Sequence, residues 1–122
     1  MEELKPDKVK SLIGKVGPSL GYDYTSGPVF PESRKDVCAV VRTAEDGSTY
    51  GFDTAYLVWA NLKGQLNHEE LINTRSSKDY IHIDEIKEDE NDIVLKLGSG
   101  GSYSGSRWDR QFNISKVKLG LK

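Results

Sequence analysis

The sequence is poor in the residues that form disulfides and zinc sites. Cys38 is its only cysteine, and His68 and His82 are its only histidines. One cysteine excludes an intrachain disulfide, and a zinc site would need both histidines together with carboxylates supplied by the fold. Cys38 lies in the apolar run 37–41. We therefore expect a buried thiol that behaves as a small hydrophobic side chain, and no metal site.

Long hydrophobic runs and a strong charge of either sign are also lacking. The longest apolar stretch, around residues 56–60, is far shorter than the roughly 18 to 20 residues of a membrane-spanning helix. Acidic residues stand at the amino terminus, where a secretory signal would be basic and then apolar. With a formal net charge of −2, the chain has no basic excess for nucleic acid or anionic lipid. We expect a soluble, cytoplasmic protein that binds neither.

Residues 6–16 are predicted to form a helix in a chain whose 122 residues suit one domain. Pro6 fits the first helical position, and Gly17-Pro18 would end the helix. The apolar residues recur with helical spacing at Val9, Leu12, Ile13 and Val16.

Residues 17–36 show neither helical nor strand periodicity and hold three of the four prolines. Loops of this length are uncommon in compact domains, and they are usually either disordered or functional. Because disordered segments are poor in aromatic residues, Tyr22 and Tyr24 favour an ordered loop over the surface.

From residue 37 to residue 121 the sequence predicts strands joined by short turns. Apolar residues on both sides of the second half of 49–61 indicate a central strand, although 55–74 could also be read as helical. In 80–87, Ile86 is out of phase with Ile81 and Ile83, which predicts a β-bulge near Asp84-Glu85. The last predicted strand covers residues 117–121. The predicted strand before it contains Trp108, which we expect to be a core residue.

The predicted fold class is therefore mainly β (α+β). It comprises one amino-terminal helix and about six or seven short antiparallel strands, in a sandwich or partly open barrel with the helix closing one end.

The glycine-rich segment 98–106 resembles phosphate-binding loops in composition only. The dinucleotide pattern requires a glycine where Tyr103 stands, and the P-loop requires Gly-Lys-Ser/Thr where Gly105 is followed by Ser106-Arg107. We expect a hairpin tip, with a mobile lid or anion site as the alternative.

The remaining motifs are incomplete in a similar way. His68-Glu69-Glu70-Leu71-Ile72 begins like the zinc motif HExxH, but Ile72 stands where the second histidine is needed. The acidic segment 84–92 lacks the glycine and the ligand order of a calcium loop. These observations predict no metal, no cofactor and no catalytic residue.

The favoured function is a small non-catalytic binding module whose protein or small-molecule ligand the sequence does not identify. Its contact surface would combine the 17–36 loop with the glycine-rich hairpin, because both are irregular segments that carry aromatic residues. The candidate ligand-binding residues are Tyr22, Tyr24, Tyr103, Arg107 and Arg110.

Two alternatives belong to other classes. Strand alternation places His82 and Asp84 on one side of the sheet, where they would form a weak acid/base site for a small molecule or a metal. The other alternative is a structural subunit that forms a homo-oligomer through a sheet edge.

Overall fold

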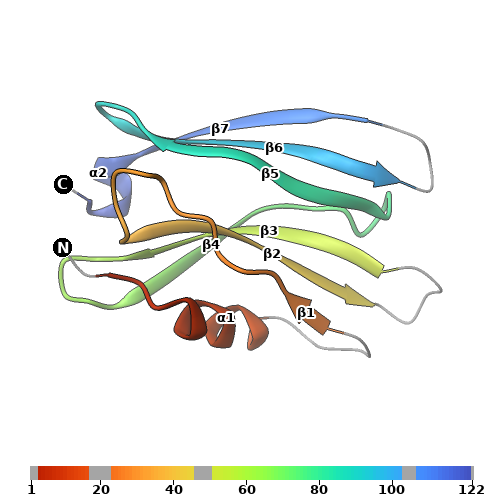
Figure 1. The fold of residues 1–122 in the computed structure, drawn as a ribbon, viewed down its shortest axis with the longest axis horizontal. Coiled ribbons are helices and arrows are strands. Elements are labelled where there is room, and N and C mark those ends of the chain that lie inside the picture. Colours follow the sequence, from red (N-terminus) through yellow and green to blue (C-terminus); the bar gives the residue numbers. More distant parts are fainter. Residues whose placement is uncertain (1–2, 17–22, 46–50, 103–106, 122) are drawn as a thin grey trace.

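The structure is a computed structural model that describes residues 3–16, 23–45, 51–102 and 107–121. Two antiparallel sheets pack face to face, and one helix lies on the outer face of the first sheet (Figure 1). This confirms the mainly β fold, and of the two predicted architectures it is the sandwich.

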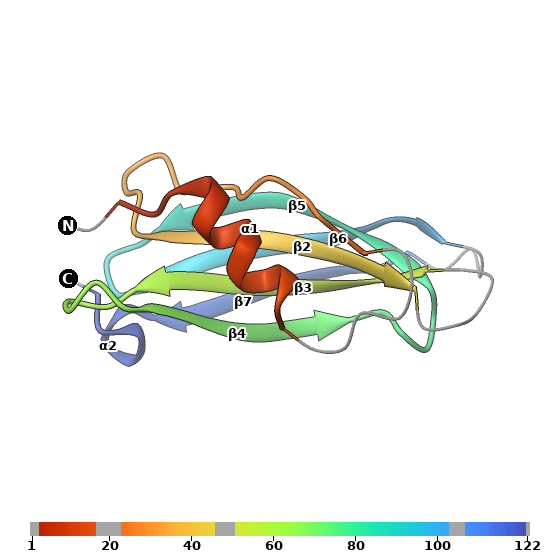
Figure 2. The same ribbon diagram turned by 90° about the horizontal axis from the view of Figure 1, so that it is seen from below.

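Within each sheet, strands that are consecutive in the chain pair with one another, so both sheets are simple antiparallel meanders. Figure 2 shows β5 along one long side of the sandwich and β4 and β7 toward the other. The first sheet has the order β1(Asp23–Thr25), β2(Val37–Glu45), β3(Gly51–Ala60), β4(Leu66–Asn73), and the second has β5(Asp79–Glu88), β6(Asp92–Ser102), β7(Asp109–Ser115).

Two hydrophobic cores hold these layers together. Between the sheets, Leu57 of β3 packs with Leu95 and Leu97 of β6, and all three side chains are fully buried. Between the first sheet and the helix, Ile13 packs in a second cluster with Val58 of β3. The predicted central strand covered on both faces is therefore β3.

The amino-terminal helix is α1(Pro6–Gly14), two residues shorter than predicted. Beyond it the N–H groups of Lys15 and Val16 bind the carbonyls of Leu12 and Ile13, each three residues back, which closes a tighter last turn. The prediction that this helix closes one end of the sandwich was wrong, because its apolar stripe packs on a sheet face (Figure 2).

The segment predicted as an ordered loop contains an edge strand. β1 pairs with β2, with Tyr24 opposite Thr43, and Val29 forms an isolated bridge to Ala39. Three residues are too few for alternation to be visible in the sequence, so the strand was missed. Residues 17–22 of the predicted loop lie outside the described residues.

Two predictions within the strand region are confirmed. Residues 66–73 form β4, so this part of the ambiguous 55–74 region is strand and not helix. The register of β5 against β6 shifts between Ile83 and Glu85, which is the predicted bulge. It turns Ile86 back to the core, where its side chain is 7% exposed.

The predicted last strand was wrong, because the chain turns into α2(Lys116–Leu119). The Ser115 hydroxyl accepts a hydrogen bond from the Lys118 N–H, and Gly120 closes the turn with a φ of 71°. Leu119 and Leu121 are buried, whereas Val117 is 87% exposed. Apolar residues at every second position fitted a strand, but only two of the three face the core.

The glycine-rich segment divides at residue 102. Its first part belongs to β6, and residues 103–106, which include the predicted hairpin tip, lie outside the described residues. In the described part of the chain, no helix is long and apolar enough to cross a membrane.

Candidate functional site at the edge of β5

The residues predicted to bind a ligand lie on different elements. Tyr24 is on β1 at the edge of the first sheet, whereas Arg110 is on β7 at an edge of the second. Arg107 stands just before β7 and is exposed. Tyr22 and Tyr103 lie outside the described residues, so the convergence of all five stays a prediction.

The two residues of the alternative site form a direct contact. The Nδ1 of His82 lies 2.7 Å from the Oδ1 of Asp84, and both side chains are 40–49% exposed on the outer face of the second sheet. Because a carboxylate only accepts hydrogen bonds, Nδ1 is the donor. In the neutral imidazole, Nε2 is then left to accept a bond from another partner. We call these two residues the edge pair.

A glycine beneath the imidazole makes room for this arrangement. Gly98 lies on β6, where it is paired with His82 of β5 on one side and with Asp109 of β7 on the other. A Cβ placed on Gly98 would lie 2.9 Å from the Cε1 of His82 and 3.1 Å from the Oδ1 of Asp109. The imidazole therefore lies over the backbone of β6, in space that any other side chain at this position would occupy.

A cleft of about 330 Å³ opens beside the edge pair, between β5 and the β1–β2 side of the first sheet. His82 lies at this cleft, and so does Tyr24, so the cleft unites one residue from each predicted site. We call it the β1/β5 cleft. Its other lining residues are Ser26, Gly27, Val29, Val41, Thr43, Asp53, Ile81 and Ile83.

The polar groups deep in the cleft are engaged within the protein. Asp53 is 3% exposed. One carboxylate oxygen accepts a bond from the Thr43 hydroxyl and the other from the Ile81 N–H, each at 2.7 Å. Burial raises the pKa of Asp53, and these two hydrogen bonds partly offset the effect. Asp53 therefore joins β3 of one sheet to β5 of the other.

The walls of the cleft, in contrast, present apolar surface to solvent. Tyr24 is 52% exposed and Val29 is 40% exposed, among the few large apolar side chains of the described chain with such exposure. Ile81 and Ile83 line the opposite wall. The cleft therefore combines a fixed polar floor with accessible apolar sides.

A second pocket of about 260 Å³, lined mostly by charged and polar residues, lies on the outer face of the second sheet. Asp84 lines it, as does Arg110, the other predicted residue that the structure brings close to the edge pair. Its remaining lining residues are Lys96, Leu97, Asp109 and Gln111. The two residues of the edge pair therefore line different hollows: His82 lines the β1/β5 cleft, and Asp84 lines this second pocket.

The cysteine plays no part in either pocket. Cys38 is fully buried, and burial raises the pKa of its thiol to about 12, as expected for a core residue. Among the residues that the structure describes, no three His, Cys, Asp or Glu side chains gather in a way that could hold a metal ion.

Sequence reasoning missed Asp53, Val29 and Gly98 as parts of this site. A usable signal exists for Asp53, because it has the same alternation phase as the buried Ala55 and Leu57. An acid on an apolar face must find partners, so its position indicated a buried hydrogen-bonded carboxylate. Gly98 and Val29 carry no comparable signal, since their roles depend on neighbouring strands.

The fold and the pockets define an antiparallel β-sandwich with an open cleft between the edges of its two sheets. No family model, curated protein or solved structure matches the chain. Its function must therefore be argued from the cleft and the residues around it.

Proposed function

We infer that the protein is a small non-catalytic binding module that takes a flat, largely uncharged ligand in the β1/β5 cleft. The exposed apolar wall formed by Tyr24 and Val29 carries this proposal. Small-molecule sites are mostly apolar hollows of roughly 300 to 1,000 Å³ with a few polar groups. At about 330 Å³ the cleft suits a ligand of one or two rings.

The chemistry of the lining supports a ring-shaped, uncharged group. The Lys10 ammonium lies over the Tyr24 ring, 5.8 Å from its centroid. A ring that enters the cleft covers the remaining exposed surface of Tyr24 and the methyl groups of Val29 and Ile83, which removes apolar surface from water. A charged group would have to give up its hydration beside Asp53, whose two carboxylate oxygens already have donors.

His82 lines the cleft as part of β5, but its imidazole lies on the outer face of the second sheet, over Gly98. The apolar walls therefore hold the ligand in this proposal, and the imidazole of His82 makes no contact with it. Inside the cleft, the carboxylate of Asp53 has both oxygens engaged by donors and is therefore not placed to act as an acid or a base. These arrangements favour binding over catalysis.

The test is a ¹H–¹⁵N chemical-shift titration with indole, whose ring is flat and uncharged. The proposal predicts saturable shifts confined to residues of the cleft. Replacing Tyr24 with alanine should weaken indole binding about three- to tenfold, since an aromatic contact contributes about 0.5 to 1.5 kcal/mol.

Tyr80→Ala is the matched control for this titration. Tyr80 is 47% exposed, close to the value for Tyr24, but does not line the cleft. Its replacement should leave indole affinity unchanged. Equal loss in both variants, or shifts scattered over the surface, would refute the proposal.

A weak acid/base site at the edge pair is the second candidate function, and the 2.7 Å contact between His82 and Asp84 favours it. In that case His82→Gln would abolish a hydrolytic activity against small ester probes such as 4-nitrophenyl acetate, while indole binding would persist. Equal rates of ester hydrolysis by the wild type and by His82→Gln would exclude an acid/base site at the edge pair.

Association through a sheet edge is the third proposal, supported by open edges at β4 and β7 in the described chain. Gel filtration over a hundredfold range of protein concentration tests it. A constant monomeric elution volume would exclude it.

A further inference from the structure

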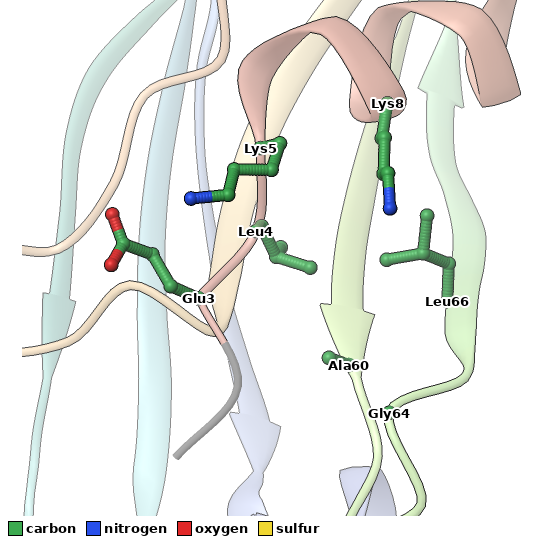
Figure 3. A pocket seen from close by; sticks show the side chains of 7 residues that line it. All are labelled: Glu3, Leu4, Lys5, Lys8, Ala60, Gly64 and Leu66. Atoms are coloured by element: carbon green, nitrogen blue, oxygen red, sulfur yellow. The ribbon is translucent and has the colours of Figure 1, made fainter.

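A separate pocket of about 370 Å³ lies on the other side of the first sheet, where the chain enters α1. Figure 3 shows it between the segment before the helix and the turn that joins β3 to β4. Its lining residues are Glu3, Leu4, Lys5, Lys8, Ala60, Gly64 and Leu66. We call it the N-terminal pocket, and it shares no lining residue with the β1/β5 cleft.

The walls of this pocket are fixed without a ligand. The Leu4 N–H binds the Lys35 carbonyl at 2.8 Å, which holds the entering segment against the sheet. On the opposite side, the Asn61 side chain accepts bonds from the N–H groups of Lys63 and Gln65 and shapes the β3–β4 turn. A preformed hollow of this kind has little ordering cost when it binds a ligand.

The floor and the rim differ in chemistry. Leu4 and Ala60 are each 4% exposed and form an apolar floor with the partly buried Leu66. Lys5 and Lys8 stand at the exposed rim, and within the described residues neither ammonium group has an acidic partner. An apolar floor under unpaired cations favours an anion that carries an apolar chain.

The two lysines contribute unequally. In Figure 3 the Lys8 ammonium points toward Leu66, whereas the Glu3 carboxylate lies on the far side, with Lys5 between them. Glu3 adds a negative charge on the Lys5 side of the pocket, so Lys8 is the cation better placed for an anion over the apolar floor. The backbone of the helix start adds little, because the Lys8 and Val9 N–H groups already bind the Lys5 carbonyl and Pro6 has no N–H.

We propose that the N-terminal pocket binds a small aliphatic carboxylate, with its chain on Leu4 and Leu66 and its carboxylate at Lys8. Neither the aliphatic chain nor the carboxylate alone is expected to give the full affinity of the ligand for the pocket. Exposed ion pairs are weak, so the apolar chain must supply much of the affinity and the charge must direct the orientation.

The test uses three probes in a ¹H–¹⁵N titration of the full chain. Hexanoate carries both features, hexanamide has the same chain without the charge, and acetate has the charge without the chain. Hexanoate should shift the amides of Leu4, Lys8 and Leu66 and saturate, whereas hexanamide and acetate should bind at least threefold more weakly.

A charge-matched pair of variants completes the experiment. Lys8→Gln should weaken hexanoate binding about threefold and leave hexanamide binding unchanged. Lys15→Gln removes the same charge just after the opposite end of α1 and should have no effect. Equal binding of hexanoate and hexanamide, equal effects of the two variants, or shifts outside the pocket would each overturn the proposal.

Discussion

Single residues at the edge of β5 decide how the site is arranged. His82 owes its position to Asp84, which fixes one ring nitrogen, and to Gly98, which leaves room for the ring. Burial raises the pKa of Asp53, and two hydrogen bonds partly offset this rise. Each of these dependences leads to a measurable consequence.

Replacing Gly98 with alanine should displace the imidazole while the fold survives. The new Cβ would lie 2.9 Å from the ring, and a half-exposed side chain can move away at low cost. We expect ¹⁵N NMR of His82 to lose the signature of a protonated Nδ1, with stability changed by less than about 1 kcal/mol. Gly14→Ala, where a Cβ meets nothing within 4 Å, is the control. An unchanged His82 spectrum in Gly98→Ala would contradict this account.

Asp53 predicts a specific dependence of stability on pH. Because burial raises its pKa, the folded protein holds this proton more tightly than the unfolded chain does. The contribution of Asp53 to stability therefore falls as pH rises from about 4 through its raised pKa. Asp53→Asn does not titrate, and its amide can still accept from the Ile81 N–H and donate to Thr43.

Urea unfolding of wild type and Asp53→Asn at pH 4, 5.5 and 7 measures this effect. The stability of the wild type relative to the variant should decrease as pH rises. Asp53→Ala should cost about 1 to 3 kcal/mol at pH 4, because it leaves the buried Ile81 N–H without an acceptor, and this cost should also decrease as pH rises. A wild-type advantage that grows with pH would show that the pKa of Asp53 is lowered instead.

At the scale of elements, one charged cluster ties together the end of the sandwich near α2. Arg34 is 3% exposed and donates two hydrogen bonds to Asp36, at 2.6 and 2.7 Å. Glu88, at the end of β5, accepts hydrogen bonds from Arg34 and from Lys116 of α2, each at 2.9 Å. The cluster therefore joins the segment before β2 to the second sheet and to α2.

Glu88 predicts the behaviour of the protein in acid. The hydrogen bond from Lys116 is the largest cause that lowers its pKa to about 2, followed by that from Ser33. A lowered pKa means that Glu88 contributes its full stability above about pH 4.5 and loses it as pH falls toward 2.

Glu88→Gln should therefore be less stable than wild type by about 1 to 2 kcal/mol at pH 7, since Glu88 is partly exposed and screened. The difference should shrink as the pH approaches 2. Glu90→Gln, at an exposed turn position, is the control and should match the wild type. A constant difference between Glu88→Gln and wild type at all pH values would argue against this ionic contribution.

Periodicity determined which elements could be predicted from the sequence. The alternation in β5, the apolar residues on both faces of β3 and the helical spacing of α1 mark long elements with buried faces. β1 was missed because three residues are too few to show a period. α2 was predicted as a strand because Val117, Leu119 and Leu121 recur at every second position. The bulge in β5 was predictable because it shifts Ile86 out of phase.

Across the whole molecule, the candidate site is a property of how the two sheets meet. Tyr24 and His82 are 58 positions apart in the numbering, and only the packing of β5 against the first sheet brings them to one cleft. The sequence could identify each as a candidate, but no local pattern links them. The same holds for Asp84 and Arg110, which line one pocket from β5 and β7.

The sandwich also separates the two proposed binding regions. The β1/β5 cleft lies between the sheets, whereas the N-terminal pocket lies where α1 meets the outer face of the first sheet. Because no residue lines both, variants in one region should leave the other unaffected, and their effects on stability should add.

Intermolecular nuclear Overhauser effects between indole and methyl-labelled protein would locate the ligand in the β1/β5 cleft directly. The account predicts contacts from the indole ring to the methyl groups of Val29 and Ile83, on opposite walls of the β1/β5 cleft. It predicts none to Val117, whose side chain is 87% exposed on α2. Contacts to Val117 equal to those with Val29 and Ile83, or contacts to neither wall, would contradict it.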